Sequence, residues 1–407
     1  MNYIRYLGVS LLLLVLQHHV TFGIQDTASV APRKVFFSVH AQQGSLLKTH
    51  KTDIVANYYV GLDLRIGWQT DDFQKNIFDR SYRYPYYGIG YYMGNMNGIV
   101  LGNDEQSGFG RPAALYAFFG APIYRGKWFQ VKYDISAGIS YNFNSYDPQV
   151  NPYNILVGSK NNAYINFGFE SVFSLPGHSS LGLGFSLQHF SNGSYQKPNK
   201  GINLVSSTVS YQFGLYKNRD KKYSRFPVPS HEPTLEWYLF IASGVRMLDT
   251  DFDPDKPRQG HRWYCANVSS ATLIKINHRR KFGAGLDLFY FDWGRYVIGY
   301  RAHENGETVT TKRSDNFALG AFLAHEVGYK RVWLVTNLGF YLNQRVGDDP
   351  KKPWIYERIG VKFQLTSRLF VGVSVKAHMA KADYTEWTVG YSLIKDRPLK
   401  RLPRNGN

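Results

Sequence analysis

Residues 188–203, QHFSNGSYQKPNKGIN, combine a base and a nucleophile at the end of an alternating run. The preceding residues are LGLGFSL, and counting by twos from Leu181 puts leucine and phenylalanine on the same strand face as His189 and Ser191. A serine hydroxyl attacks an ester carbonyl when a base takes its proton, and a histidine two residues away on one strand face can act as that base. The pair therefore predicts ester hydrolysis beside an apolar surface.

Nearby residues could complete this site. A third group must hold the imidazole in the correct tautomer, and Asn203 begins the next alternating segment, INLVSSTVSYQF, across the expected hairpin from His189. Asn192 and Gly193 follow Ser191 directly, where an amide side chain and a flexible backbone N–H could bind an oxyanion. The alternative is that these residues have no catalytic role and only lie in a loop near lipid head groups.

The strands that would position these residues are typical of a membrane β-barrel. The chain of 407 residues is 16% aromatic and contains 38 glycines. Segments of roughly ten residues alternate apolar with polar or small residues, as in NYYVGLDLRIGW, and are separated by turn-forming residues. After the N-terminal segment no apolar run reaches the length of about eighteen residues that a membrane helix needs. We therefore predict an all-β, outer-membrane antiparallel barrel, although a soluble β-sandwich also alternates.

The N-terminal segment and the charge indicate the compartment. Arg5 precedes an apolar run from Leu7 to Leu16, which predicts a signal peptide over residues 1–23. The single cysteine, Cys265, cannot form an internal disulfide. The formal net charge is +18, and we expect the basic loops to bind the phosphates of lipopolysaccharide or other anionic lipids rather than nucleic acid. The alternative is a generally basic, solvated surface without a specific partner.

The mature chain divides into two similar halves. About eight strand-like segments occupy residues 34–214, a charged and proline-containing linker covers 215–234, about eight more segments occupy 235–395, and a basic tail covers 396–407. Three pairs of strings recur in the same order: GLDL at 61–64 and 285–288, YINFG at 164–168 and YERIG at 356–360, and GFSLQH at 184–189 and GVSVKAH at 372–378. We predict a duplication that gives two eight-stranded units, with one larger continuous barrel of about sixteen strands as the alternative.

The second copy is expected to be noncatalytic. Its histidine, His378, falls one residue later than in the first copy and so shares a face with Ser374 and Lys376 rather than with the apolar valines. No serine follows two residues after it. We therefore expect His378 to face the lumen.

The string HFSNGSYQKPNKGIN resembles the signature of the PagL-type lipid A deacylases, also called the acyloxyacyl hydrolase family, in which His-x-Ser-Asn is followed by Asn-x-Gly. The resemblance is specific over residues 164–213. It implies an outer-membrane barrel of about eight strands, with a bilayer-facing active site that removes the ester-linked acyl chain at the 3-position of lipid A.

Carried over by residue, the resemblance makes His189 the base, Ser191 the nucleophile and Asn192 the oxyanion contact. The family's glutamate would fall at Asn203, and an asparagine can orient a histidine, as in papain-like enzymes, but supplies no charge. Glu170 is the alternative third member.

The expected partners are lipid A and the outer membrane of a Gram-negative bacterium, and association into a homodimer stays open. No cofactor or metal is expected, because no Cys/His cluster is present and the acidic run 249–255 lacks the glycine and glutamate of a calcium loop. The alternative function is a noncatalytic barrel, either a pore or a lipid-binding protein.

Overall fold

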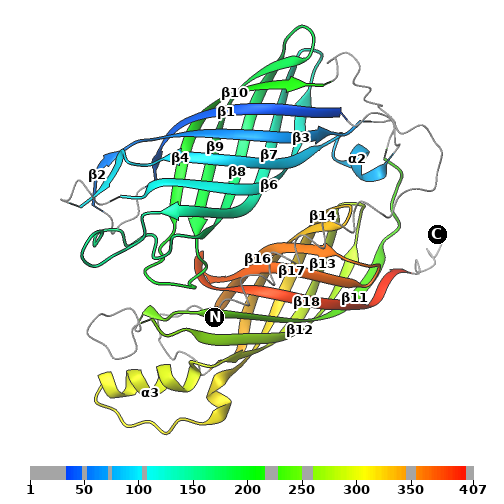
Figure 1. Cartoon of the computed structure of the whole chain (residues 1–407). Coiled ribbons are helices and arrows are strands. Elements are labelled where there is room, and N and C mark those ends of the chain that lie inside the picture. Colours follow the sequence, from blue (N-terminus) through cyan, green and yellow to red (C-terminus); the bar gives the residue numbers. More distant parts are fainter. Residues whose placement is uncertain are drawn as a thin grey trace, which may run out of the picture. The chain divides into compact units, whose positions relative to one another are not determined.

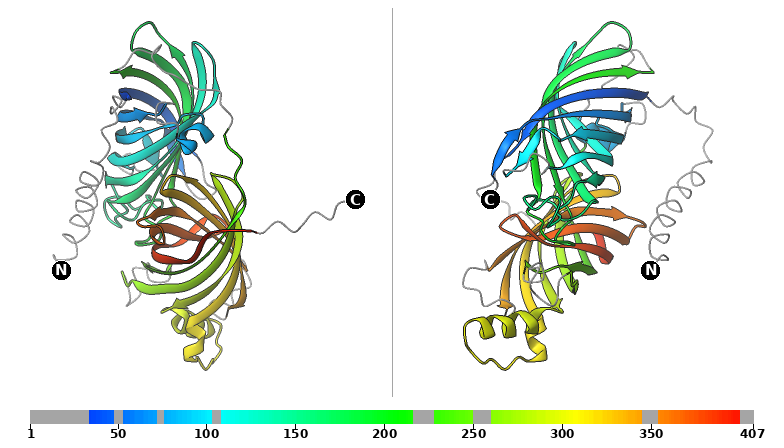
Figure 2. Two further views of the ribbon diagram at one scale, coloured as in Figure 1. Left: turned by 90° about the vertical axis from the view of Figure 1, so that its right-hand side faces the viewer. Right: turned by 60° about the vertical axis from the view of Figure 1, so that its left-hand side comes forward.

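The computed structural model describes residues 34–47, 53–71, 76–102, 108–215, 228–249, 260–344 and 354–399. They form two closed antiparallel barrels, each of eight strands (Figure 1). The views in Figure 2 show the strands of each barrel curving round to close on themselves. The predicted pair of eight-stranded units is therefore confirmed, and the single larger barrel is excluded.

The first barrel contains the residues of the predicted site. In chain order its strands are β1 (Lys34–Leu46), β3 (Tyr59–Gln69), β4 (Tyr86–Asn95), β6 (Gly110–Arg125), β7 (Phe129–Phe143), β8 (Asn162–Ser174), β9 (Ser179–Ser191) and β10 (Ile202–Gly214). Pairing of β1 with β10 closes it. A short helix, α2 (Ile77–Ser81), and a small sheet of β2 (Ile54–Asn57) and β5 (Ile99–Leu101) lie in its connections.

The second barrel is built in the same way, and β11 pairs with β18 to close it. Its strands are β11 (Thr234–Arg246), β12 (Trp263–Lys275), β13 (Arg280–Phe291), β14 (Phe317–Tyr329), β15 (Val332–Gln344), β16 (Ile355–Gln364), β17 (Leu369–His378) and β18 (Lys381–Pro398). The helix α3 (Gly294–Glu304) and the 3₁₀ turn η3 (Arg313–Asn316) connect β13 to β14. No helix among the described residues is long and apolar enough to cross a membrane.

Alternation along each strand separates an apolar outer face from a polar lumen. In the first barrel the buried guanidinium of Arg65 contacts the carboxylates of Asp63 and Asp134, and Lys132 pairs with Glu170 at 2.8 Å. Charges removed from water are tolerated when they are paired and hydrogen-bonded in this way. The lumen is therefore filled by side chains rather than open.

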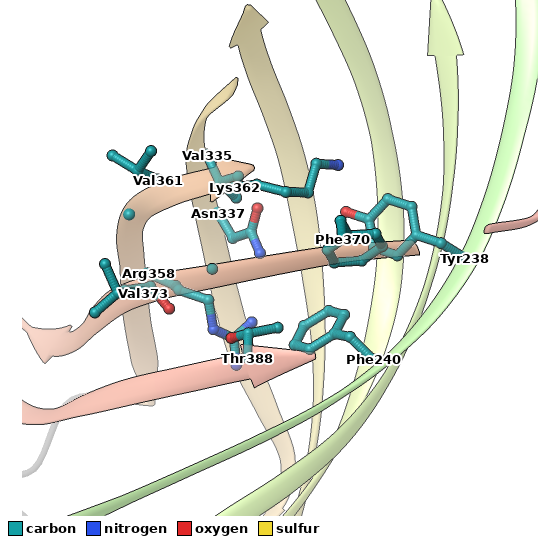
Figure 3. Close-up of a pocket in the computed structure, with 13 residues that line it drawn as sticks. Tyr238, Phe240, Val335, Asn337, Arg358, Val361, Lys362, Phe370, Val373 and Thr388 are labelled. Atoms are coloured by element: carbon teal, nitrogen blue, oxygen red, sulfur yellow. The ribbon is translucent and has the colours of Figure 1, made fainter. Parts of the chain in front are cut away.

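The lumen of the second barrel is also packed. Arg358 lies between Asp287 and Glu386, with nitrogen–oxygen distances of 3.2 and 2.6 Å. Beside it is a small cavity of about 40 Å³, which Asn337, Arg358 and Lys362 line together with aromatic rings (Figure 3). A space of this size holds only water-sized molecules and does not form a channel.

The two rims of the first barrel differ in the length of their connections. At one rim β6 joins β7 through residues 126–128, and β8 joins β9 through 175–178. At the other rim β7 joins β8 through 144–161, and β9 joins β10 through 192–201. The rim with long loops carries the predicted site, at the end of β9.

Two of the three recurring string pairs occupy equivalent strands, which supports the predicted duplication. The strings at 164–168 and 356–360 lie in the sixth strands, β8 and β16, and those at 184–189 and 372–378 lie in the seventh, β9 and β17. The GLDL pair was wrongly matched, because it lies in β3 and β13, the second and third strands of their barrels. Every strand alternates, so a four-residue string recurs by chance.

Some predicted boundaries shift or cannot be compared. The second unit begins at Thr234 rather than 235, and β18 continues to Pro398, past the predicted start of the tail, because Leu235 pairs with Arg397 across the closing seam. The predicted signal peptide, most of the linker and most of the acidic run 249–255 lie outside the described residues.

Candidate active site

The end of the β9–β10 hairpin positions His189 and Asn203 as direct cross-strand partners. Both side chains belong to the outward face of the barrel, and below them on β9 the outward residues Leu183 and Leu187 are exposed. On the neighbouring strand β8, the partner of His189 is the exposed Ile165. A polar pair thus stands at the rim of an apolar, lipid-facing surface.

The imidazole of His189 is oriented by Asn203. Its Nδ1 lies 2.7 Å from the Asn203 Oδ1 atom. An amide oxygen can only accept, so Nδ1 carries the proton and Nε2 is the basic nitrogen of the neutral ring. Gly201 packs against the ring edge, since a Cβ added there would lie 3.0 Å from Cε1.

Ser191 lies at the last position of β9 and is buried beneath the β9–β10 loop. Its Oγ accepts hydrogen bonds from the backbone N–H of Gly193 at 3.2 Å and from the side-chain amide of Asn199 at 2.9 Å. No hydrogen bond joins Ser191 to His189. Two N–H donors therefore already converge at the hydroxyl of the expected nucleophile.

Asn192 is held within the loop rather than directed at Ser191. Its side-chain amide donates to the Ser159 hydroxyl at 2.8 Å and to the Gln196 carbonyl at 2.9 Å. A further backbone hydrogen bond, from Gly201 N–H to the carbonyl of Leu156 at 3.0 Å, ties the same loop to the β7–β8 connection. The Asn192 side chain therefore fixes the loop that carries the donors.

The contact from Asn199 was not among the residues selected from the sequence. The available signal was the Asn-x-Gly element, Asn199 to Gly201, within the motif. In the structure its first residue reaches the Ser191 hydroxyl, and its last residue contacts the His189 ring. Period-two counting cannot find such contacts, because it applies to strands and not to loops.

Glu170, the alternative third member, points into the lumen. It pairs with Lys132 and accepts a hydrogen bond from Ser210. His189 lies on the opposite face of the barrel wall, so Glu170 cannot orient its imidazole.

His378, the histidine of the second barrel, faces the lumen as its register indicates. Its Nε2 lies 3.0 Å from the Tyr341 hydroxyl, and its Nδ1 lies 3.6 Å from the Asp383 carboxylate. No serine occupies the position that Ser191 has relative to His189. The second barrel therefore lacks the arrangement of the first.

Closed barrels with apolar outer faces and packed lumens define an outer-membrane β-barrel protein. Residues 61–212 match the family described as "Lipid A 3-O-deacylase (PagL)", and residues 235–396 match "Acyloxyacyl hydrolase, C-terminal domain". The chain belongs to this family of lipid A deacylases, which are ester hydrolases, and it carries the additional C-terminal domain. No curated protein matches the chain.

Solved structures resemble the chain at low identity. "Crystal structure of the outer membrane enzyme PagL" is 18% identical, with 42% of this chain and 97% of that chain covered and a TM-score of 0.29. "Crystal structure of the Pseudomonas putida toluene transporter TodX" is 11% identical, with coverage of 89% and 90% and a TM-score of 0.18.

Proposed function

We propose that this protein removes the ester-linked acyl chain at the 3-position of lipid A by a Ser/His mechanism in the outer membrane of a Gram-negative bacterium. The observation that carries the proposal is the His189–Asn203 hydrogen bond on the outward face, beside a serine that already receives two N–H donors. An ester at the base of a lipid head group lies at the depth of such a rim.

The geometry supports the following sequence of steps. Substrate displaces the N–H donors from Ser191, whose hydroxyl turns to His189 and gives its proton to Nε2 as Oγ attacks the carbonyl carbon. Catalytic hydrogen bonds are often long or poorly aligned before substrate binds and tighten in the complex, so the lack of one here does not rule out this role. Asn203 holds the ring throughout through Nδ1.

The displaced donors then acquire a second role. Gly193 N–H and the Asn199 amide, which converge at Ser191, can donate to the oxyanion of the tetrahedral intermediate. Collapse of the intermediate breaks the ester bond, and His189 returns its proton to the leaving sugar oxygen. Water, deprotonated by the same imidazole, attacks the acyl-serine. The bond to Ser191 Oγ breaks, His189 returns the proton to that oxygen, and a fatty acid is released.

Mass spectrometry of lipid A from cells that express the protein tests this function. The wild type should convert lipid A to a species that lacks one ester-linked acyl chain. Ser191→Ala and His189→Ala should each lower the rate by roughly 10³-fold or more, because the two groups act as one unit.

His378→Ala is the matched control, since it removes a histidine from the equivalent strand of the second barrel. Its rate should equal that of the wild type. Equal losses from His189→Ala and His378→Ala, or unchanged lipid A with the wild type, would contradict the proposal.

A further inference from the structure

A second lipid-facing feature lies on the outer surface of the first barrel, at the rim with long loops. It is a groove of about 630 Å³ that crosses the ends of β3, β4, β6 and β7. Its walls include Leu62, Met93, Arg111, Tyr91 and Tyr141. The groove is thus formed by one barrel alone.

The groove is separate from the site at His189. Around the first barrel the strands follow the order β1-β10-β9-β8-β7-β6-β4-β3, so the pair β4–β6 lies half a turn away from β9–β10. No serine or histidine lines the groove. The groove lies at the same rim as the candidate active site, and therefore in the same membrane leaflet. It lacks the serine and histidine of that site.

Polar groups also line the groove. The hydroxyls of Tyr91 and Tyr141 lie 2.8 Å apart and span the buried Ala113 of the strand between them. Arg111 is exposed, and its backbone carbonyl accepts a hydrogen bond from the Asn142 amide at 3.0 Å. No described carboxylate pairs with the Arg111 guanidinium. One cation and two phenols are therefore presented together at the membrane rim.

Away from this rim the barrel presents large apolar side chains. Ile89, Leu115 and Ile139, which lie further along β4, β6 and β7, are 51%, 60% and 68% exposed. Arg111 at the start of β6 is thus followed, away from the rim, by a mixed surface of tyrosine and aliphatic side chains, which complements a lipid with an anionic head group.

We propose that this groove binds a second molecule of lipid A, which it does not cleave. A phosphate of the lipid would contact Arg111 and the tyrosine hydroxyls, and its acyl chains would lie over the aliphatic residues below. The choice of lipid A rests on the proposed function, because the groove opens to the leaflet from which the site at His189 would take its substrate.

Native mass spectrometry in detergent tests this proposal with His189→Ala protein, which should not consume the lipid. With bis-phosphorylated lipid A we expect two molecules bound per chain. Arg111→Glu should raise the dissociation constant of one of them by about tenfold or more, because it replaces a charge-assisted contact by repulsion. Lys127→Glu is the matched control, since Lys127 is also exposed but belongs to the turn at the opposite rim.

Several outcomes would overturn the groove site. The first is a single molecule of lipid A bound per chain. The second is an equal loss of lipid A affinity in Arg111→Glu and Lys127→Glu. The third is binding of phosphatidylglycerol with the same affinity as lipid A. Deacylation by the wild type is measured separately. An active enzyme that binds one lipid A refutes the groove alone, whereas two bound molecules without any deacylation refute the proposed function and leave the groove.

Discussion

A carboxylate at position 203 would both orient the His189 imidazole and stabilise its charged form, whereas Asn203 can only orient it. Its amide oxygen accepts the Nδ1 proton of His189 and so fixes the tautomer and the ring. It carries no charge, and so in the proposed mechanism it would not stabilise the imidazolium that forms when Ser191 loses its proton. The site therefore has a third member that orients the histidine, as in a catalytic triad, but this member carries no charge.

Substitution of Asn203 measures these roles one at a time. Asn203→Ala should lower kcat/KM by roughly tenfold, because it removes one hydrogen bond. Asn203→Asp keeps the shape and adds the charge, so it should raise the rate and move the acid limb of the pH–rate profile to higher pH, because a carboxylate favours the protonated imidazole. Asn203→Glu, the family's residue type, should also raise the rate.

These rates would be followed on purified lipid A in detergent, with circular dichroism as the check on folding. If Asn203→Ala retains the wild-type rate and both acidic variants bring no gain, the imidazole is oriented by another group.

Asn199 and Asn192 provide a second test at the residue scale, because they are the same residue type in the same loop. Only Asn199 donates to the Ser191 hydroxyl, whereas Asn192 donates to Ser159 and Gln196. Asn199→Ala should lower kcat by roughly 10²–10³-fold with little change in KM, as loss of an oxyanion donor does. Asn192→Ala should act through loop order and raise KM. The reverse pattern would assign the oxyanion contact to Asn192, as the family resemblance implies.

At the scale of elements, the β9–β10 connection returns to the barrel at Gly201. This residue has a φ of +78°, which favours glycine, and it packs against the imidazole. Gly201 therefore both allows the turn of the backbone and leaves space for the imidazole that Asn203 orients.

Gly177 is a matched control for Gly201. It has a φ of +80° in the β8–β9 turn, but a Cβ there would meet nothing within 4 Å. Gly201→Ala and Gly177→Ala should each lose about 1 kcal/mol of stability from backbone strain. Only Gly201→Ala should also lose activity, because its methyl group displaces His189. Chemical denaturation and the deacylation rate separate the two effects, and equal activity of both variants would show that the ring tolerates displacement.

The strands were predictable from the sequence, and the loop contacts were not. Period-two alternation places His189 and Asn203 on one outward face and His378 in the lumen, because an apolar outer face and a polar lumen are a physical requirement of a barrel in lipid. The partners of Ser191 depend on how residues 192–201 fold back, and no periodicity governs that path. Asn199 was therefore missed.

At the scale of the whole molecule, both barrels are plugged by their own side chains. Arg65 and Arg358 each lie between two carboxylates in the lumen of their barrel. Removal of one partner of such an ion pair strongly destabilises the folded protein, because the other partner remains buried and charged. The lumen is thus a packed core, and its charges are paired with one another.

We therefore expect no steady ion conductance when the purified protein is added to a planar lipid bilayer. A porin measured in the same bilayer is the control for insertion and for the detection of single channels. Regular conductance steps from the wild-type protein would indicate an open path through a lumen and would favour the alternative of a pore.

The outward position of His189 also determines how substrate arrives. A site that faces the aqueous lumen would meet its substrate by diffusion in three dimensions, but the polar pair at the end of β9 faces the surrounding lipid. Under the proposed function, substrate approaches sideways within the plane of the membrane, and the quantity that saturates the enzyme is the mole fraction of the lipid at the surface rather than its bulk concentration. Dilution of lipid A with inert detergent at constant bulk concentration would slow the reaction, whereas dilution of whole micelles with buffer would leave the rate per enzyme unchanged.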